Sequence, residues 1–410
     1  MNVLATLGGL NAIGFFARFS YALARTPVLP LFALFLGAGP EAVGLAVGVS
    51  TVTGILFKMP SGALSDVIGR RRTMLVGLVV FALLPFCYLW VDDYRTLVFV
   101  RFVHGLATAV YGPVSMAVVA EVAGARKGEM LSWFSSVTIV GTLLGAPVGG
   151  FLLHSSPAHA APGLGDFRAV FLLSGAVGLL ALLLGITLLR REPSRAGGAG
   201  LRERVSRFVE GIREVVSDRR VLVISAMEGL QNMLMGVLEA FLPVYAVLRA
   251  GLSEFEAGLL WAVQIVMTMF SKPLMGRIGD RFGRKTNIVA GLAACAVSFA
   301  CVPHLAGFAG LAAASMLFGL GEALVTSSSA ALVADLCRRR HYGAAMGAFG
   351  TIFDVGHAAG PILAGVLVAA LDFGLAFGIL ALVLLAAIPV FVRGVRLDDE
   401  PADRTKEVSP

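Results

Sequence analysis

The sequence predicts an all-α membrane protein whose twelve transmembrane helices form two pseudo-symmetric bundles of six. Three observations lead to this prediction. Hydrophobic residues make up 57% of the 410 positions and charged residues only 14%, whereas a typical soluble domain has roughly 25% charged residues. The chain contains twelve apolar stretches of membrane-spanning length. In addition, one charged motif occurs twice, beginning at Gly62 and again at Gly276.

Each apolar stretch can cross a bilayer, because a helix needs roughly 20 predominantly apolar residues to span the hydrocarbon core. The alternating polarity of β-barrel strands is absent from them. The first stretch lacks the short apolar core and the small-residue cleavage site of a signal peptide, so we expect it to be retained. The predicted spans are residues 11–36, 42–62, 73–91, 96–119, 129–153, 168–189, 221–248, 256–276, 287–306, 308–333, 343–370 and 372–393.

The distribution of positive charge predicts the orientation of these spans. A net charge of +7 could indicate nucleic-acid binding, but the basic residues gather in the connections on the side of the N-terminus. The opposite connections hold little beyond Arg95, Arg168 and Arg249. Such a bias marks the cytoplasmic side. We therefore expect no nucleic-acid partner and an integral protein of the bacterial inner (plasma) membrane with both termini in the cytoplasm.

Residues 191–220 separate the two halves. They begin as a flexible Pro/Gly/Ala-rich linker, and apolar residues then recur at helical spacing from Leu201 to Val215 with arginines between them. This pattern is typical of a basic amphipathic helix on the inner membrane face, and a solvated linker helix is the alternative. The predicted organisation is a six-helix bundle at 1–190, a cytoplasmic linker at 191–220, a second six-helix bundle at 221–393 and a cytoplasmic tail at 394–410.

The repeated motif indicates an internal duplication. GALSDVIGRRR at 62–72 and GRIGDRFGRKT at 276–286 lie 214 positions apart, and the same offset relates Lys58 to Lys272 and Glu121 to Asp335. Internal symmetry of this kind is typical of secondary transporters. Each half therefore needs the same loop between its second and third helices.

The glycines of the motif predict a tight turn. We expect Gly62 and Gly276 to permit close helix approach. Gly69 and Gly283 are expected to adopt positive φ where the chain reverses, since glycine has no Cβ atom.

The charged residues of the motif predict contacts at the same end of the molecule. Asp66 and Asp280 are placed to accept from the positive N-terminus of a neighbouring helix. For Asp66 we expect this helix to be the eleventh, near Tyr342–Ala345, when the cavity faces outward. The basic residues can pair with acids or with lipid phosphates. They are Arg70, Arg71, Arg284 and Lys285.

With these residues the chain resembles the major facilitator superfamily, whose second-to-third-helix loop reads G-x-L-x-D-x-x-G-R-[KR]. The first copy matches every fixed position, with Gly62, Leu64, Asp66, Gly69, Arg70 and Arg71. The second copy matches with Gly276, Asp280, Gly283, Arg284 and Lys285, and has Ile278 in place of the leucine. The resemblance implies the major facilitator fold, in which two six-helix bundles surround a cavity that opens to alternate sides. It also implies that helices one, four, seven and ten line the cavity.

Further motifs resemble the twelve-helix drug:proton antiporter branch of this family. They are PVLP at Pro27–Pro30 in helix one, Arg101 with His104 and Gly105 in helix four, and a glycine motif in helix five that helix eleven echoes. Small residues in the glycine motif let helices from opposite halves approach closely. The residues of this helix-packing motif are Gly141, Gly145, Pro147, Gly149, Gly150, Gly356, Gly360 and Pro361.

Ionisable and polar residues inside the spans are the candidates for function, because burying such groups in lipid is unfavourable unless they face a cavity or a partner. The N-terminal half presents mainly cations and the C-terminal half mainly acids. The candidates for proton coupling and the cavity are Arg25, Arg101, His104, Glu239, Glu322, Asp354 and His357. Further polar residues of the cavity are Arg18, Tyr111, Glu228, Gln231 and Asn232.

Within this set we expect Glu239, Glu322 and Asp354 to be the coupling acids. Lys58 and Lys272 lie near helix ends and are interpreted as structural. Aligning Pro30 with Pro243 places Arg25 and Glu239 about one position apart in the repeat, so they should lie at similar depth. Because an isolated buried charge is unfavourable, we predict a direct or water-bridged Arg25–Glu239 pair in at least one state.

The function that these residues predict is a secondary active transporter that exports amphipathic small molecules in exchange for protons. A transporter of anionic metabolites or lipids that uses the basic N-terminal half is the alternative, and a non-transporting membrane sensor or scaffold is a third possibility. No catalytic or metal-ligand spacing points to an enzyme, and we expect no cofactor. The expected partners are a small-molecule substrate, protons and membrane lipids, and we expect a monomer.

Overall fold

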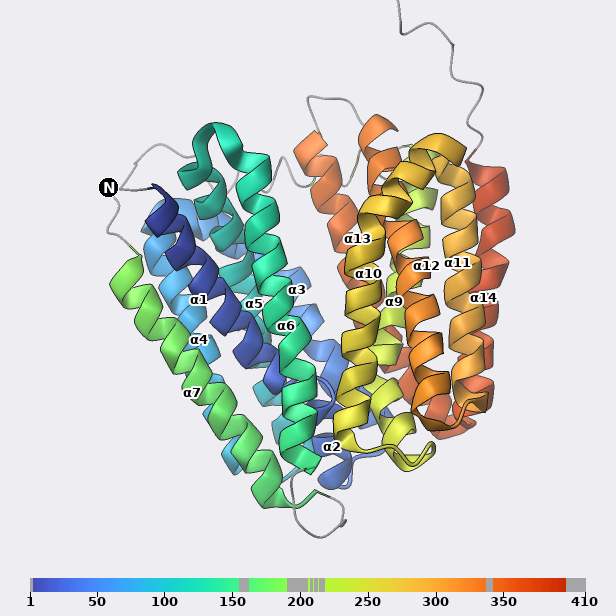
Figure 1. Cartoon of the computed structure of the whole chain (residues 1–410), viewed down its shortest axis with the longest axis horizontal. Helices are drawn as coiled ribbons and strands as arrows, with labels where there is room; N and C mark the ends of the chain where they lie inside the picture. Colours follow the sequence, from blue (N-terminus) through green and yellow to red (C-terminus); the bar gives the residue numbers. More distant parts are fainter. Residues whose placement is uncertain are drawn as a thin grey trace, which may run out of the picture.

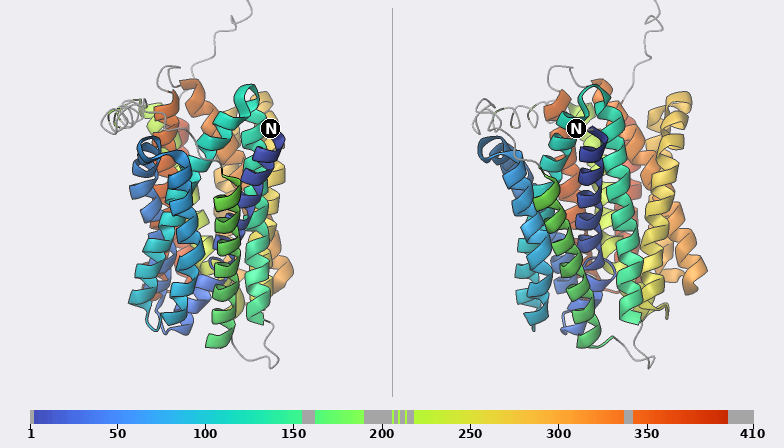
Figure 2. Two further views of the ribbon diagram at one scale, coloured as in Figure 1. Left: turned by 90° about the vertical axis from the view of Figure 1, so that its left-hand side faces the viewer. Right: turned by 60° about the vertical axis from the view of Figure 1, so that its left-hand side comes forward.

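The computed structural model describes residues 3–154, 162–189, 218–336 and 342–395, together with Ser206, Val209 and Arg213. All regular secondary structure in these residues is helical, and the helices run roughly parallel in two bundles (Figures 1 and 2). Apart from these three residues, which are helical, the proposed amphipathic helix after residue 200 lies outside the described residues, as does the tail from residue 396.

The helices of the two halves follow one another in the expected order. The N-terminal half contains α1 (Val3–Leu23), α2 (Val28–Phe35), α3 (Pro40–Ile68), α4 (Arg70–Cys87), α5 (Tyr94–Ala123), α6 (Lys127–His154) and α7 (Leu164–Leu188). The C-terminal half contains α9 (Arg219–Leu248), α10 (Glu254–Phe282), α11 (Arg284–Cys301), α12 (Gly307–Leu336), α13 (Tyr342–Ala370) and α14 (Phe373–Gly394). Eleven helices in the described part of the chain are long and apolar enough to cross a membrane, and they coincide with the second to twelfth predicted spans.

The first predicted span is not one continuous helix. Residues 11–36 were expected to form a single helix, but α1 ends at Leu23 and the short α2 begins only at Val28. Pro27 explains the break, because it lacks a backbone N–H and disfavours helical geometry in the residue before it. The prediction of one uninterrupted span is therefore wrong at this point.

Polar residues define where several helices begin. Asp93 accepts hydrogen bonds from the backbone N–H groups of Arg95 and Thr96, at 2.8 and 3.1 Å, and so caps α5. Hydrogen bonds from the side chain and backbone of Thr96 lower the pKa of Asp93. Ser253 and Glu256 form a reciprocal capping box at the start of α10. Such caps satisfy N–H groups that the first turn of a helix leaves unpaired.

The two loop motifs form equivalent structures in the two halves. Gly69 has φ +97° and Gly283 has φ +96°, which confirms the predicted turns. Arg70 forms an ion pair with Glu121 at 2.5 Å, and Arg284 forms the equivalent pair with Asp335. These pairs are related by the 214-residue offset. The offset therefore describes contacts as well as sequence.

The next basic residue of each loop binds the C-terminal end of the last helix of its half. Arg71 donates to the carbonyl oxygen of Leu189 at 2.8 Å, just beyond the end of α7. Lys285 donates to the carbonyl oxygen of Val395 at 2.7 Å, just beyond the end of α14. A cation at a helix C-terminus satisfies carbonyl groups that the last turn leaves unpaired.

The expectations for the first glycine and for the aspartate of each loop motif are not confirmed in this structure. A Cβ atom added at Gly62 or Gly276 would meet no atom within 4 Å among the described residues, so these glycines do not mark a close helix approach in this conformation. The reason is that the bundles diverge at this end (Figure 1). Asp280 binds Arg284 at 3.1 Å, whereas the side chains of Asp66 and of residues 342–345 lie outside the described part.

The two bundles meet at the opposite end of the molecule. A Cβ atom at Gly258 would lie 2.5 Å from the carbonyl oxygen of Ala146, and one at Gly365 would lie 2.6 Å from that of Pro40. Thus α6 packs on α10 and α3 packs on α13, with backbone against backbone. We call this the closed end, and the end that carries the two basic loops the open end.

Most of the glycine motif packs within a half rather than between halves. A Cβ atom at Gly141 would lie 2.6 Å from the carbonyl oxygen of Phe15, and one at Gly149 would lie 2.8 Å from that of Leu23. Gly145 likewise meets Ala22, so three of the motif's glycines lie against α1.

The same correction holds for helix eleven. Gly356 packs against the backbone of Gly229, and Gly360 against that of Met233, both on α9 of the same half. The prediction that these residues bring opposite halves together is therefore wrong for most of them, because α6 and α13 contact a helix of their own half on one face and the other half on another. The motif residues that do contact the other half are Gly150, Pro147 and Pro361.

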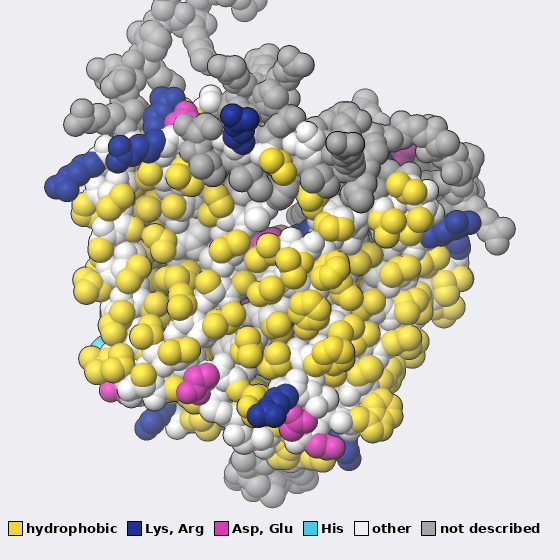
Figure 3. Space-filling view, turned by 180° about the vertical axis from the view of Figure 1, so that it is seen from behind, with side chains coloured by type: hydrophobic (Ala, Val, Ile, Leu, Met, Phe, Trp, Pro, Cys, Tyr) yellow, Lys and Arg dark blue, Asp and Glu magenta, His cyan; other side chains and the backbone are white. Residues whose placement is uncertain are grey.

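The outer surface fits a membrane environment. Figure 3 shows one face covered by hydrophobic side chains, with Lys, Arg, Asp and Glu side chains gathered near its two ends. Large apolar side chains are exposed on many of the described long helices, for example Leu183 at 57% on α7 and Leu382 at 65% on α14. Exposed apolar surface of this extent is expected where lipid is the solvent.

Candidate functional site

A cavity of about 450 Å³ lies between the two halves. Its walls come from α1, α3 and α5 of the N-terminal half and from α9, α12 and α13 of the C-terminal half. The four helices that the resemblance implied, α1, α5, α9 and α12, all contribute, and α3 and α13 add to them. Six of the predicted residues line the cavity: Arg18, Arg25, Asn232, Glu322, Asp354 and His357.

The central feature of the site is a three-residue cluster that joins the halves. Arg25 donates to Glu239 at 2.7 Å, which confirms the predicted pair in this state. The two residues are 214 positions apart, so they occupy equivalent places in the repeat. Glu239 is only 1% exposed, so its charge depends on this partner.

His357 completes this cluster. Its Nε2 atom lies 3.2 Å from Arg25 Nη2 and 3.1 Å from Glu239 Oε2. One ring nitrogen cannot accept from the guanidinium and donate to the carboxylate at once. An unprotonated Nε2 accepts from Arg25, whereas a protonated Nε2 donates to Glu239. The position of one proton therefore selects between two hydrogen-bond arrangements.

A second ion pair also crosses between the halves. Lys58 on α3 donates to Asp354 on α13 at 2.5 Å, and both line the cavity. Their side chains are 43% and 15% exposed. The interpretation of Lys58 as a structural residue at a helix end is therefore wrong in position, because the residue faces the cavity and pairs with a predicted coupling acid.

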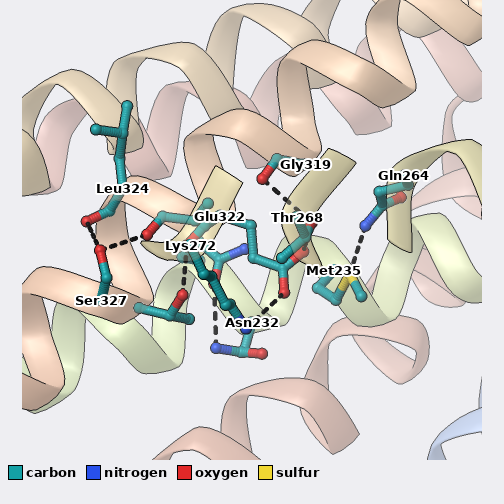
Figure 4. A network of polar contacts seen from close by, with 12 residues as sticks. Asn232, Met235, Gln264, Thr268, Lys272, Gly319, Glu322, Leu324 and Ser327 are labelled. Atoms are coloured by element: carbon teal, nitrogen blue, oxygen red, sulfur yellow. Dashed lines mark hydrogen bonds and ion pairs between the residues drawn. The ribbon is translucent and has the colours of Figure 1, made fainter. Parts of the chain in front are cut away.

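The remaining acids lie in the C-terminal half. Glu322 on α12 accepts a hydrogen bond from Thr268 at 3.0 Å and lies 4.0 Å from the ammonium of Lys272, as Figure 4 shows. Like Lys58, Lys272 therefore lies near a predicted coupling acid rather than only at a helix end. On α9, Asn232 donates to the carbonyl oxygen of Glu228 at 3.0 Å and to the side chain of Gln231 at 3.1 Å. Glu228, Gln231 and Asn232 are all buried.

The candidate residues of helix four, which is α5, face the interior of their own bundle. Arg101 is fully buried, with its guanidinium carbon 4.9 Å from the centre of the Tyr21 ring. The Nδ1 atom of His104 lies 3.1 Å from the hydroxyl of Tyr88. Tyr111 is 2% exposed. None of these three lines the cavity, because α5 directs this face toward α1 and α4.

Sequence reasoning missed several residues of the wall. Tyr21, Ser50 and Thr51 line the cavity together with Lys58. Tyr21 lies one turn before Arg25, and its ring contacts both Arg25 and Arg101. The 214-residue offset between Lys58 and Lys272 could have identified Lys58 as a candidate site residue. An uncharged Ser or Thr in an apolar span gave no such indication.

The comparisons with known proteins agree with this architecture. The sequence pattern of the Major Facilitator Superfamily matches residues 11–271 and 250–410. The chain therefore belongs to the Major Facilitator Superfamily and is a membrane transporter by family. Among the described residues no group of three or more His, Cys, Asp or Glu side chains is placed to hold a metal ion.

Individual relatives are distant. The chain is 24% identical over 178 residues to the quinolone resistance protein NorA of Staphylococcus aureus, a match that covers 43% of either protein. It is 24% identical over 336 residues to the chromaffin granule amine transporter of Rattus norvegicus, covering 81% of this chain. These matches span 43% and 61% of the relatives' own lengths.

Solved structures match over nearly the whole chain. The structure of the nucleoside transporter NupG superposes with a TM-score of 0.81 at 13% identity, covering 97% of this chain and all of that one. A POT family transporter in complex with 5-aminolevulinic acid has a TM-score of 0.75 at 14% identity, covering 94% and 95% of the two chains. At these identities the likeness shows the fold alone.

Proposed function

We propose that this transporter exports amphipathic small molecules in exchange for protons. The similarity to a quinolone resistance protein and to an amine transporter supports a substrate of this class. The cavity supports it too, since aromatic and apolar side chains such as Tyr21, Met116 and Phe353 stand beside charged groups. A pocket of this composition suits a molecule with both apolar and polar parts.

The observation that carries the proposal is the position of His357. Its Nε2 atom contacts both Arg25 and Glu239, which belong to opposite halves. A histidine can gain or lose a proton near neutral pH, and each state favours a different partner. Proton binding can therefore change the bond that holds the two halves together, which is the requirement for coupling.

We further propose that the open end faces the cytoplasm of a bacterial cell. The two basic loops lie there, and an excess of basic residues marks the cytoplasmic side. In this orientation the described state receives substrate from inside. A change of state then opens the closed end, where α3 meets α13 and α6 meets α10.

A second candidate is a transporter of anionic molecules. Arg18 lines the cavity and forms no ion pair with any residue in the described ranges. Its electrostatic neighbours are Tyr21, Arg25 and Tyr111. An unpaired guanidinium at a cavity wall can hold a carboxylate or phosphate of a substrate.

Proteoliposomes test both candidates. The lumen contains a pH-sensitive dye, and a panel consisting of a quinolone, ethidium and salicylate is added in turn. We expect proton movement in the opposite direction when the quinolone or ethidium is transported, and loss of it in Glu239→Gln. Arg249→Gln, at an exposed helix end, is the control and should behave as wild type. Stimulation by salicylate alone, abolished in Arg18→Gln, would instead support the anion transporter.

A further inference from the structure

The closed end carries a pair of titratable groups that joins the two halves outside the cavity. His154 is the last residue of α6 and Glu254 is the first residue of α10. These helices belong to opposite halves and lie side by side (Figure 1). The Nδ1 atom of His154 lies 3.4 Å from Oε2 of Glu254. The pair therefore spans a junction that has to separate when the closed end opens.

The packing around the pair fixes the position of both side chains. Gly150, about one turn before His154, lies directly against the backbone carbonyl group of Glu254. Phe151 and Phe255 contact each other edge to face, with 5.9 Å between their ring centres. The two helix ends therefore cannot move apart without separating His154 from Glu254.

The imidazole of the pair is open to the medium, whereas the carboxyl group is largely covered. The side chain of His154 is 50% exposed and that of Glu254 is 11% exposed. Water at the closed end can thus exchange a proton with His154 while α6 and α10 remain packed. In the described part of the chain, no other Lys, Arg or His nitrogen lies within 4.0 Å of the Glu254 carboxylate.

The charged groups on the elements around α6 are engaged elsewhere. On α7, Asp166 accepts from a backbone N–H group at the start of its own helix, at 2.8 Å, and Arg168 donates to a carbonyl oxygen after α4, at 3.4 Å. Arg25, just beyond α1, belongs to the cavity cluster. Arg95, at the start of α5, is exposed, and α2 has no charged residue.

The elements around α10 offer no substitute for His154 either. On α10 itself, Glu256 is held in the capping box, where it accepts from a backbone N–H group at 2.9 Å. Arg249, after α9, and His304, after α11, are exposed, and neither lies within 4.0 Å of Glu254. The first half of α12 carries no charged residue. The proton on His154 therefore decides whether this junction holds an ion pair.

Protonation of the imidazole strengthens the contact. A protonated ring has an N–H group on both nitrogens and a positive charge, whereas a neutral ring has one N–H group and no charge. A cation at the C-terminus of α6 and an anion at the N-terminus of α10 also complement the dipoles of the two helices. This gain exists only while the closed end is shut, because opening separates the partners.

The internal repeat supplies a comparison for this junction. The 214-residue offset relates Glu254 to Pro40 on α3 and His154 to Val368 on α13. Neither Pro40 nor Val368 has a group that binds a proton, and Val368 is buried. Of the two junctions of the closed end, the one between α6 and α10 therefore carries the titratable pair.

We propose that His154 and Glu254 form a proton-operated latch, in which a proton from the outside medium holds the closed end shut and favours the state open to the cytoplasm. The proposal rests on the orientation proposed above, in which the closed end faces outside, and not on the coupling of transport to protons. The imidazole takes its proton from the outside medium and returns it there, so the latch itself moves no proton across the membrane.

Distances between spin labels across the closed end test the latch without substrate or a pH gradient. The labels are attached at Trp90→Cys, just after α4, and at Leu248→Cys, at the end of α9, which are exposed positions in opposite halves. The native cysteines are replaced by alanine, and the protein is held in nanodiscs at pH 8 or pH 5.5. The ratio of the short to the long distance measures how often the closed end is shut.

The latch predicts a specific pattern of ratios. At pH 5.5 we expect the ratio in the wild type to exceed that in His154→Gln about two- to fivefold, the range of a partly exposed ion pair. At pH 8 the two should be equal. Glu254→Gln should behave like His154→Gln, and His154→Lys, which stays charged at pH 8, should keep the higher ratio there. Comparing variants at one pH removes the effect of groups that titrate in both.

The control is a second imidazole at the same end of the molecule. His304→Gln should match the wild type at both pH values, because His304 is exposed and has no partner across the halves among the described residues. Equal ratios in the wild type and His154→Gln at pH 5.5 would overturn the latch. So would a wild-type ratio in Glu254→Gln, since the proton would then act without this carboxylate.

The outcome is separable from that of the proposed function. If transport proves uncoupled from protons while the ratios follow this pattern, the exchange mechanism is wrong and the latch stands. If transport is proton-coupled but the pattern fails, only the latch is wrong. Labelling of Leu248→Cys by a membrane-impermeant reagent in intact cells checks the orientation, and a site that reacts only after lysis would overturn the control by outside pH.

Discussion

Buried charge sets the properties of single residues in this cavity. Glu239 is 1% exposed and Arg25 is about a quarter exposed, so each depends on the other. Removing one partner of a buried pair typically destabilises a protein by about 3–5 kcal/mol, because the other charge remains uncompensated. Lys58 and Asp354 are more exposed, and exposed pairs contribute only about 0–1 kcal/mol. The two pairs that cross between the halves are therefore not equivalent.

Charge reversal tests the Arg25–Glu239 pair. We expect Arg25→Glu and Glu239→Arg each to reduce transport by at least about tenfold, the change in rate that roughly 1.4 kcal/mol produces. The double exchange should recover part of the activity, because it restores one cation and one anion across the halves. The measurement is ethidium efflux from cells with matched expression. A double variant no better than the worse single one would rule out the pairing as functional.

Replacing the imidazole tests the role of His357. In His357→Gln the side chain still forms hydrogen bonds but, unlike an imidazole, has no group that binds or releases a proton. We expect the dependence of transport rate on pH to become flatter between pH 5 and 8. His154→Gln, at a half-exposed histidine at the end of α6, is the comparison. An unchanged pH profile in His357→Gln would show that the proton acts elsewhere.

At the same scale, the sequence predicted the positions of some charged residues correctly and those of others wrongly. Matching prolines in helices one and seven placed Arg25 beside Glu239, since the repeat relates their depth. Arg101 was placed in the cavity because it lies on helix four, which the resemblance implied to line the cavity. The structure shows it buried against Tyr21 instead, because a 3.6-residue period gives a face and not the identity of the neighbouring helix.

Helices and their crossings form the next scale. The backbones of α3 and α13 touch at the closed end, where Gly44 lies against the carbonyl group of Pro361. Pro40 lies against Gly365, and Glu254 lies against Gly150. The 214-residue offset of the repeat relates Pro40 to Glu254. Crossings that depend on glycine can separate and close again without rearranging side chains, which suits helices that must move apart.

A methyl group at the crossing should open the closed end. We expect Gly44→Ala to push α3 away from α13, because the added Cβ atom would overlap the backbone of Pro361. Labelling of a single cysteine introduced in the cavity, by a membrane-impermeant reagent applied from the closed side, should then increase several-fold. Gly378→Ala provides the control, since a Cβ atom there meets nothing within 4 Å in the described residues. Equal labelling of the two variants would contradict this view of the crossing.

At the scale of helices, the predictions from sequence were correct where the polarity of a segment alone determines its structure. Eleven of the twelve predicted spans coincide with helices of the described residues, because a long apolar stretch in lipid must form a helix to satisfy its backbone. The break at Pro27 was missed, since apolar composition continues unchanged through it. The packing partners of Gly141 and Gly356 were also missed, because a glycine motif indicates a close approach but not which helix approaches.

At the scale of the whole molecule, the internal repeat explains the architecture. Equivalent ion pairs, Arg70–Glu121 and Arg284–Asp335, and equivalent turns at Gly69 and Gly283 fix each bundle separately. The halves themselves meet through few charged contacts and a set of backbone crossings. Two rigid bundles joined in this way can rock about the cavity, and the duplicated motif allowed this fold to be predicted before any contact was known.

The proposed exchange requires protons and substrate to move in opposite directions through one cavity. Reversal of the pH gradient in proteoliposomes, with ethidium as the substrate, is the decisive measurement. With an acidic lumen we expect ethidium to accumulate inside as protons leave, and with an alkaline lumen we expect preloaded ethidium to be expelled. A Glu239→Gln variant should show neither movement. Ethidium flux in a direction independent of the gradient, or in the same direction as the protons, would contradict the exchange of substrate for protons.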